Sequence, residues 1–152
     1  MAGIGPYDLA QYRIDSALER LEASRVLIDS GLYQDAVSRA YYAVFQTARA
    51  VLATKSLDSK KHSGVISLFN KEFIKTGKLP RDFGKILKKA KDLRQASDYN
   101  DFYLVSKEAK DALESAERFI EGTKACRILI AIDYKVYLSC QSCNPVQKAL
   151  NL

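Results

Sequence analysis

The feature that most constrains this chain is a helical spacing of apolar residues that recurs along most of its length. Apolar side chains return at steps of three and four residues, the period that places them on one face of an α-helix. We therefore predict five amphipathic helices: 8–30, 33–53, 59–75, one that opens at Pro80, and 105–121.

Residues with special backbone preferences stand between these segments. Gly31 is placed to end the first helix in the left-handed conformation that glycine adopts without strain. Pro80 suits the first turn of the fourth helix, and Asn100-Asp101 is a turn signal after it. We expect Gly122 to close the fifth helix.

Five amphipathic helices joined by short connections bury their apolar faces most easily as an up-down bundle. We predict an all-α domain over residues 7–122, in which the first two helices form an antiparallel hairpin. The 152 residues are 47% hydrophobic, enough for a real core. No apolar run reaches the roughly 20 residues that span a bilayer. The first residues lack a basic segment followed by an apolar one, so we expect no secretory signal. We expect a cytoplasmic protein without a membrane partner.

Residues 123–152 differ from the rest and are predicted to form a C-terminal extension. Ile128–Ile132 is a continuous apolar run, and alternating apolar and polar residues follow it to Leu138. Periodicity alone leaves helix and strand both open here. So much apolar surface needs a cover, which we expect to be the bundle or a dimer partner.

The chain holds few residues for metal or nucleophilic chemistry. Cys140 and Cys143 have the spacing of half a zinc site, but the remaining ligand types are only Cys126 and the single histidine, His62. Phosphate-binding loops and dinucleotide motifs are absent from the sequence. We predict no metal and no cofactor. On its own helix, His62 is interpreted as a packed or rim histidine before a catalytic one.

Basic residues are concentrated in the middle of the chain. The net charge is +6, yet residues 55–94 contain 12 basic and 4 acidic residues, so the rest is slightly acidic. Such a stretch favours a polyanionic partner such as RNA or an acidic protein surface, although a solvated helix face would show the same excess. Candidate nucleic-acid contacts are Lys88, Lys91, Arg94 and, beside the apolar stripe of the second helix, Arg39. The alternative for Arg39 is a surface ion pair.

Arg94 lies at the edge of the apolar stripe of the fourth helix. Asp98, four residues later, can hold its guanidinium in an i,i+4 pair. Such a pair alone stabilises a helix by about 0.2–0.5 kcal/mol. An oriented arginine can also bind phosphate with its planar set of donors. Tyr99 meets Arg94 only if the chain leaves helical geometry nearby.

Tyr41, Tyr42 and Phe45 are expected in the core or at a dimer interface.

Four segments together resemble the HEPN-domain family over residues 7–122: SRAYYAVF (38–45), KHSGVIS (61–67), FIKTGKLP (73–80) and LRQASDY (93–99). The resemblance implies a helical bundle that dimerises. It also implies a metal-independent ribonuclease toxin, encoded beside a small nucleotidyltransferase antitoxin.

The hallmark of that family is an arginine followed, after four to six residues, by a histidine. The resemblance assigns the arginine to Arg94 and the histidine position to Tyr99, or to Asn100 or Asp101. Tyrosine titrates near pH 10 and is a poor base at neutral pH.

Two arrangements would restore a proton carrier: Tyr99 activated by Arg94 across a dimer interface, or His62 folded close to Arg94. The candidate catalytic set is Arg94, Asp98, Tyr99 and His62. The alternative function is a non-catalytic module that binds a nucleotide or pairs with a nucleotidyltransferase.

Overall fold

The computed structural model describes residues 5–99 and 106–126, and within them every regular element is helical. This confirms the predicted all-α class. In chain order the elements are α1 (Pro6–Asp29), α2 (Tyr33–Ala53), α3 (His62–Phe69), the five-residue π-helical turn η1 (Asn70–Ile74), α4 (Arg81–Tyr99) and α5 (Ser106–Ala125).

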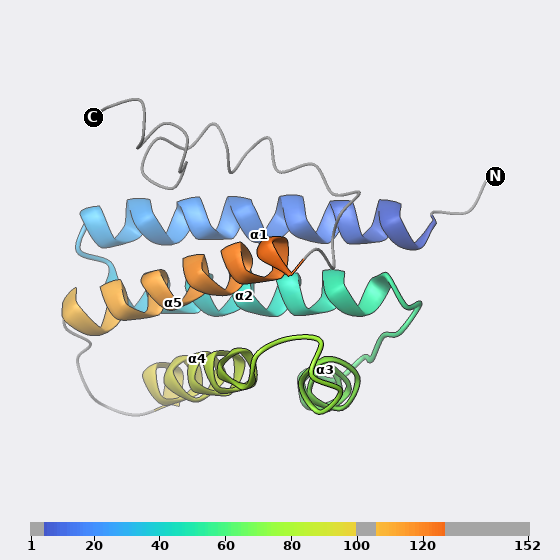
Figure 1. Ribbon diagram of the computed structural model, residues 1–152. Coiled ribbons are helices and arrows are strands. Elements are labelled where there is room, and N and C mark those ends of the chain that lie inside the picture. Colours follow the sequence, from blue (N-terminus) through green and yellow to red (C-terminus); the bar gives the residue numbers. More distant parts are fainter. Residues whose placement is uncertain (1–4, 100–105, 127–152) are drawn as a thin grey trace.

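The first two helices form the predicted antiparallel hairpin, and the other helices pack around α2 (Figure 1). Gly31 makes the turn with φ 75°, as its sequence position indicates. Ser24 Oγ donates to the carbonyl of Ala36 across the hairpin at 2.8 Å. In Figure 1, α1 lies on one side of α2, while α3 and α4 lie on the other. Residues on α2 therefore reach both layers.

The core is built on small residues of α2 and on phenylalanines from the later helices. Alanines that are almost fully buried let neighbouring helices approach α2 closely: Ala36, Ala40, Ala43, Ala48, Ala50 and Ala53. Phe119 of α5 lies 5.6 Å from Phe69 and 5.2 Å from Phe83, measured between ring centroids. Offset aromatic packing of this kind stabilises a core beyond its buried area.

The third helix is shorter than its apolar spacing indicates. The prediction of 59–75 is wrong at its first residues, because the helix begins at His62; toward its end the α-helix gives way after Phe69 to η1, which continues to Ile74. Lys61, the residue before His62, has an extended backbone, with φ −102° and ψ 140°. At the other end, the amide of Lys75 donates to the carbonyl of Asn70, the five-residue step of a π-turn. An apolar period does not distinguish α from π turns.

Gly122 does not close the fifth helix, which continues to Ala125. A Cβ atom at Gly122 would lie 1.9 Å from Phe83 Cζ. The glycine therefore serves close packing of α5 against the first turn of α4 instead of capping.

The structure leaves several sequence predictions open. Those for Asn100-Asp101, Ile128–Leu138, Cys140 and Cys143 lie outside the described residues. Among the described helices, none has the length and apolar character needed to cross a membrane.

Candidate phosphate-binding site

Three aromatic residues of α2 and the first residue of α3 form one group, which we call the aromatic cluster: Tyr41, Tyr42, Phe45 and His62. The His62 ring stacks on Phe45 with centroids 4.2 Å apart and planes inclined by 25°. Its Nδ1 atom is 2.9 Å from the hydroxyl of Tyr41. Because Nδ1 is engaged in this way, Nε2 is the nitrogen left for another partner.

Arg94 of α4 contacts the same cluster. Its guanidinium carbon lies 5.2 Å from the ring centroid of Tyr42 and 5.7 Å from that of Tyr41, within cation–π range. Asp98 approaches Arg94 Nε at 3.3 Å, and the two side chains are 30% and 31% exposed. The partial shelter predicted for Arg94 is therefore present. The structure brings Arg94 and His62 onto the same pair of tyrosines.

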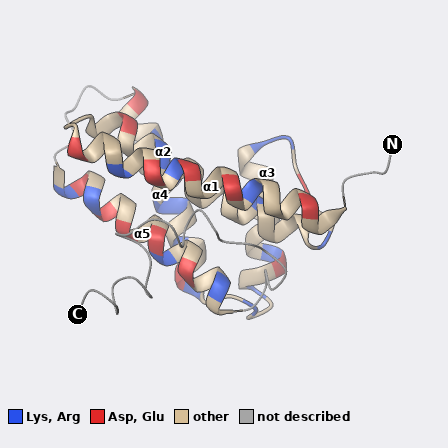
Figure 2. Ribbon diagram, turned by 90° about the horizontal axis from the view of Figure 1, so that it is seen from above, with Lys and Arg blue, Asp and Glu red and all other residues tan. Residues whose placement is uncertain are grey.

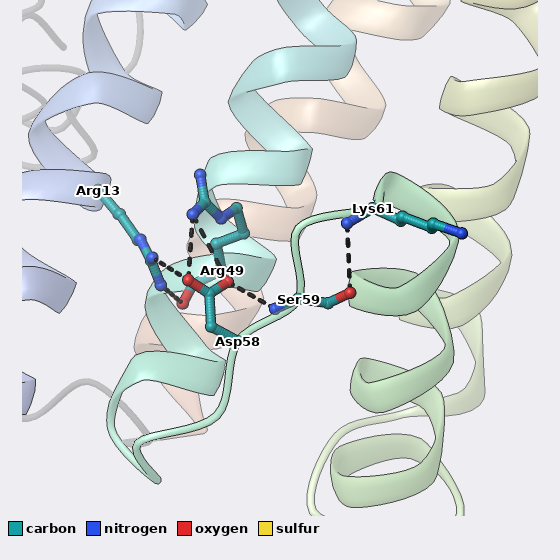
Figure 3. Close-up of polar contacts among 5 residues, drawn as sticks. All are labelled: Arg13, Arg49, Asp58, Ser59 and Lys61. Atoms are coloured by element: carbon teal, nitrogen blue, oxygen red, sulfur yellow. Dashed lines mark hydrogen bonds and ion pairs between the residues drawn. The ribbon is translucent and has the colours of Figure 1, made fainter.

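The loop before His62 is held by one carboxylate, that of Asp58 (Figure 3). Arg13 of α1 donates to it at 2.9 Å, the amide of Ser59 at 2.8 Å, and Arg49 of α2 lies 3.3 Å away. Arg13 is almost buried and also donates to the carbonyl of Arg49. Burial raises the pKa of Asp58, but these hydrogen bonds outweigh it and hold the pKa below its usual value. The start of α3 is thereby tied to the α1–α2 hairpin.

Positive charge surrounds a neutral aromatic cluster. Burial, followed by Arg94, Lys91 and Arg49, lowers the pKa of His62 below 6.5, so the ring is uncharged at pH 7. Burial and Tyr42 raise the pKa of Tyr41 to about 12 against the opposing effect of Arg94, so its hydroxyl stays protonated. A site with several cations and an uncharged centre favours an anion.

The charge excess of residues 55–94 is divided between α4 and the segments 55–61 and 75–80 that flank α3 and η1. Basic and acidic residues are interspersed along α1 and α5 (Figure 2). By contrast, residues 81–94 of α4 contain 6 basic and 2 acidic residues, half of the excess, and α4 lies on the other side of α2 from α1 (Figure 1).

Of the remaining predicted site residues, Lys91 lies near the aromatic cluster, whereas Tyr99, Lys88 and Arg39 are exposed and have no described contact with it. Tyr99 ends α4 and is 80% exposed, and the helix does not bend before it to bring it onto Arg94. Lys91 is close enough to affect His62, as given above. Lys88 and Arg39 are exposed. In the described part of the chain, neither makes a hydrogen bond or ion pair.

Sequence reasoning missed three contributors to this site. The hydroxyl of Tyr41 was hidden because its ring fits a core position. Asp58 and Arg49 were not considered. Asp58 lies 45 residues from Arg13 and 9 from Arg49 in the sequence, and contacts at such separations give no periodic signal. Within residues 5–99 and 106–126, no group of three metal-ligating side chains forms.

The described residues form a helical bundle in which Arg94 and His62 contact the same two tyrosines. The HEPN domain profile matches residues 10–126, and the chain belongs to this family. It is 40% identical over 114 residues to a Methanocaldococcus jannaschii protein named "Putative toxin", covering 75% of this chain and 85% of that one.

Two further relatives support the same placement. A second protein of that name from the same organism is 41% identical over 112 residues, which cover 73% of this chain and 76% of the relative. A UPF0332 protein of Thermotoga maritima is 35% identical over 115 residues, 75% of this chain and 87% of the relative. The chain is thus a HEPN protein, and two of its relatives are named putative toxins.

Proposed function

We propose that this protein is a metal-independent RNA endonuclease of the toxin type, which acts as a homodimer and is paired with a nucleotidyltransferase antitoxin. The observation that carries the proposal is the contact of Arg94 and His62 with the same two tyrosines. It supplies a phosphate-binding cation and a proton acceptor at one place. The names of the relatives support the toxin role.

The chemistry is transesterification within the RNA strand. The 2′-oxygen attacks the neighbouring phosphorus, the bond from phosphorus to the 5′-oxygen breaks, and a 2′,3′-cyclic phosphate and a 5′-hydroxyl result. Arg94 binds the non-bridging oxygens and stabilises the charge that develops on them. Asp98 orients Arg94 through their ion pair.

His62 takes the proton of the 2′-hydroxyl on Nε2, and water gives a proton to the leaving 5′-oxygen. For Nε2 to have a free lone pair, Nδ1 must carry the ring hydrogen and donate it to the Tyr41 oxygen, 2.9 Å away. The lowered pKa keeps the ring unprotonated at neutral pH. A bound phosphate offsets the nearby cations and raises the basicity of the ring.

The test is cleavage of labelled RNA in EDTA by wild type, Arg94→Ala, His62→Ala, Tyr99→Phe and, as a control, Arg20→Gln on α1. We expect Arg94→Ala and His62→Ala each to lose about 10²-fold or more in rate. Tyr99→Phe and Arg20→Gln should cleave like wild type, and a 2′-deoxy residue at the cleaved position should block the reaction.

Other results reassign or end the proposal. Loss of activity in Tyr99→Phe, with His62→Ala active, would make Tyr99 the proton carrier across a dimer interface. Equal activity in all five proteins would mean that a contaminating nuclease, and not this protein, cleaves the RNA. Light scattering establishes whether the protein is a dimer at the assay concentration, and co-purification with a co-expressed neighbouring nucleotidyltransferase tests the antitoxin pairing.

A non-catalytic module is the second candidate. The exposed Tyr99 favours it, since this residue stands where the family pattern places histidine. Absence of cleavage by any variant at concentrations that give a dimer, together with co-purification of the nucleotidyltransferase, would establish this function instead.

A further inference from the structure

A second arginine packs against the aromatic cluster. The guanidinium carbon of Arg49, on α2, lies 6.0 Å from the ring centroid of Phe45, and Phe45 in turn stacks on His62. Arg94 contacts the tyrosine rings of the same cluster. Two guanidinium groups from different helices therefore meet one cluster at different rings.

Arg49 is only weakly neutralised. Its NH2 group is 3.3 and 3.5 Å from the two carboxylate oxygens of Asp58, whereas Arg13 donates to the same carboxylate at 2.9 Å. One negative charge is thus shared by two arginines, and Arg13 has the shorter bond. A net positive charge remains, and Arg49, 27% exposed, is the arginine that solvent reaches more easily.

The same two arginines each have a buried nitrogen without a hydrogen-bond partner. Among the described residues, the buried side-chain nitrogen and oxygen atoms without a hydrogen-bond partner are Nε of Arg49 and Nε of Arg94. The contact of Arg94 Nε with Asp98 is an ion pair whose geometry is not that of a hydrogen bond. A buried polar atom left without a partner is uncommon, so each of these two arginines retains an unused donor beside the cluster.

We propose that Arg49 is a second phosphate-binding residue, so that a single RNA strand crosses the aromatic cluster with one phosphate on Arg94 and a neighbouring phosphate on Arg49. The proposal rests on the RNA binding of the proposed function and does not require cleavage. It adds that the site holds a strand by two phosphates, one on each arginine, at the cluster that contains His62. A nucleotide polyphosphate offers similar chemistry, and the experiment distinguishes it.

The experiment measures binding of a single-stranded 2′-O-methyl RNA oligonucleotide over a series of salt concentrations. This probe lacks the attacking 2′-hydroxyl, so binding is separated from cleavage. Each phosphate contact contributes about 0.7 to the slope of log affinity against log salt concentration for a single strand. We expect Arg49→Gln and Arg94→Gln each to reduce the magnitude of the slope by about 0.7. Arg49→Lys should retain it.

Two control variants have matched charge changes. Arg20→Gln removes one positive charge from α1, away from the cluster, and should leave the slope unchanged. Asp58→Asn frees Arg49 from its competing carboxylate and should bind the oligonucleotide more tightly than Asp29→Asn, an equal charge change at an exposed position. This gain should disappear in the Asp58→Asn/Arg49→Gln double variant. Circular dichroism shows that each variant is folded.

Three results would overturn the assignment. The first is a slope for Arg49→Gln equal to that of Arg20→Gln, and the second is binding by Asp58→Asn no tighter than by Asp29→Asn. The third is binding of ATP with the same dependence on Arg49 but no binding of the oligonucleotide, which would assign the two arginines to a nucleotide. Cleavage that depends on Arg94 alongside any of these would leave the proposed function standing.

Discussion

Replacement of Gly122 by alanine tests the close packing of α5 on α4. Helix propensity alone predicts that Gly122→Ala stabilises the protein by about 1 kcal/mol, because α5 continues past this residue. The structure predicts the opposite sign. The new Cβ would lie 1.9, 2.8 and 3.0 Å from three carbon atoms of the Phe83 ring.

The size of the expected loss in stability depends on whether the Phe83 ring can move away from the new Cβ. Phe83 is buried and its ring also packs on Phe119 at 5.2 Å, so it has little room to shift. Overpacking a core costs about 1–3 kcal/mol, and here the overlap is severe enough for the upper part of that range. After the gain in propensity is subtracted, Gly122→Ala should lower the free energy of unfolding by about 1–2 kcal/mol.

The assay is urea denaturation followed by circular dichroism at 222 nm. Gly84→Ala is the matched control, because the nearest atom to its new Cβ is the side-chain oxygen of Asn70, which can rotate away. We expect Gly84→Ala to be neutral or stabilising. Phe83→Leu, which shortens the opposing side chain, should recover part of the loss in Gly122→Ala. A Gly122→Ala protein as stable as wild type or more so would refute the packing argument.

The remaining predictions concern the residues around His62. Asp58→Asn should lower the free energy of unfolding at pH 7 by about 1–2 kcal/mol, since it weakens the partner of the nearly buried Arg13 while position 58 stays half exposed. Because the pKa of Asp58 is lower in the folded than in the unfolded state, its contribution is present above the unfolded pKa and disappears as pH falls through the folded pKa. Denaturation at pH 7 and pH 3 should therefore show the two proteins converging in acid, and a difference independent of pH would contradict this. The single histidine allows the ring to be followed by nitrogen-15 NMR, which should show a pKa below 6.5 that rises in Arg94→Gln; an unchanged pKa would mean that Arg94 does not act on the ring. The same spectra should show hydrogen on Nδ1, as a base that uses Nε2 requires, and a ring with hydrogen on Nε2 would contradict that role.

Helix positions were largely predictable from the sequence, since α2 lies at the predicted 33–53 and Gly31 has its expected conformation. Both follow from local chemistry, an apolar period and a preferred backbone angle. The errors arose where tertiary contacts override a local signal. Gly122 resembles a helix stop but faces Phe83, and residues 59–61 fit a helical period but belong to the loop that Asp58 holds.

In the candidate site too, features set by local sequence could be predicted and those set by tertiary packing could not. The pairing of Arg94 with Asp98 is encoded by a four-residue spacing. The proximity of His62 to Arg94 was only one of two open arrangements, because it depends on how α3 and α4 pack against α2. Tyr41 and Arg49 could not be recognised beforehand, since an aromatic or an arginine beside an apolar stripe has the same pattern whether or not it faces a site.

The separation of His62 and Arg94 in the chain has a consequence for synthesis. A chain made from its N-terminus exposes the α1–α2 hairpin and His62 before Arg94 has been added, and domains begin to fold in that order. A ribosome-bound chain that ends before α4 holds the aromatic residues and the histidine but not Arg94. The proposed mechanism therefore requires α4 to have left the ribosome and docked before any RNA is cleaved, which would protect the RNA on which the chain is being made.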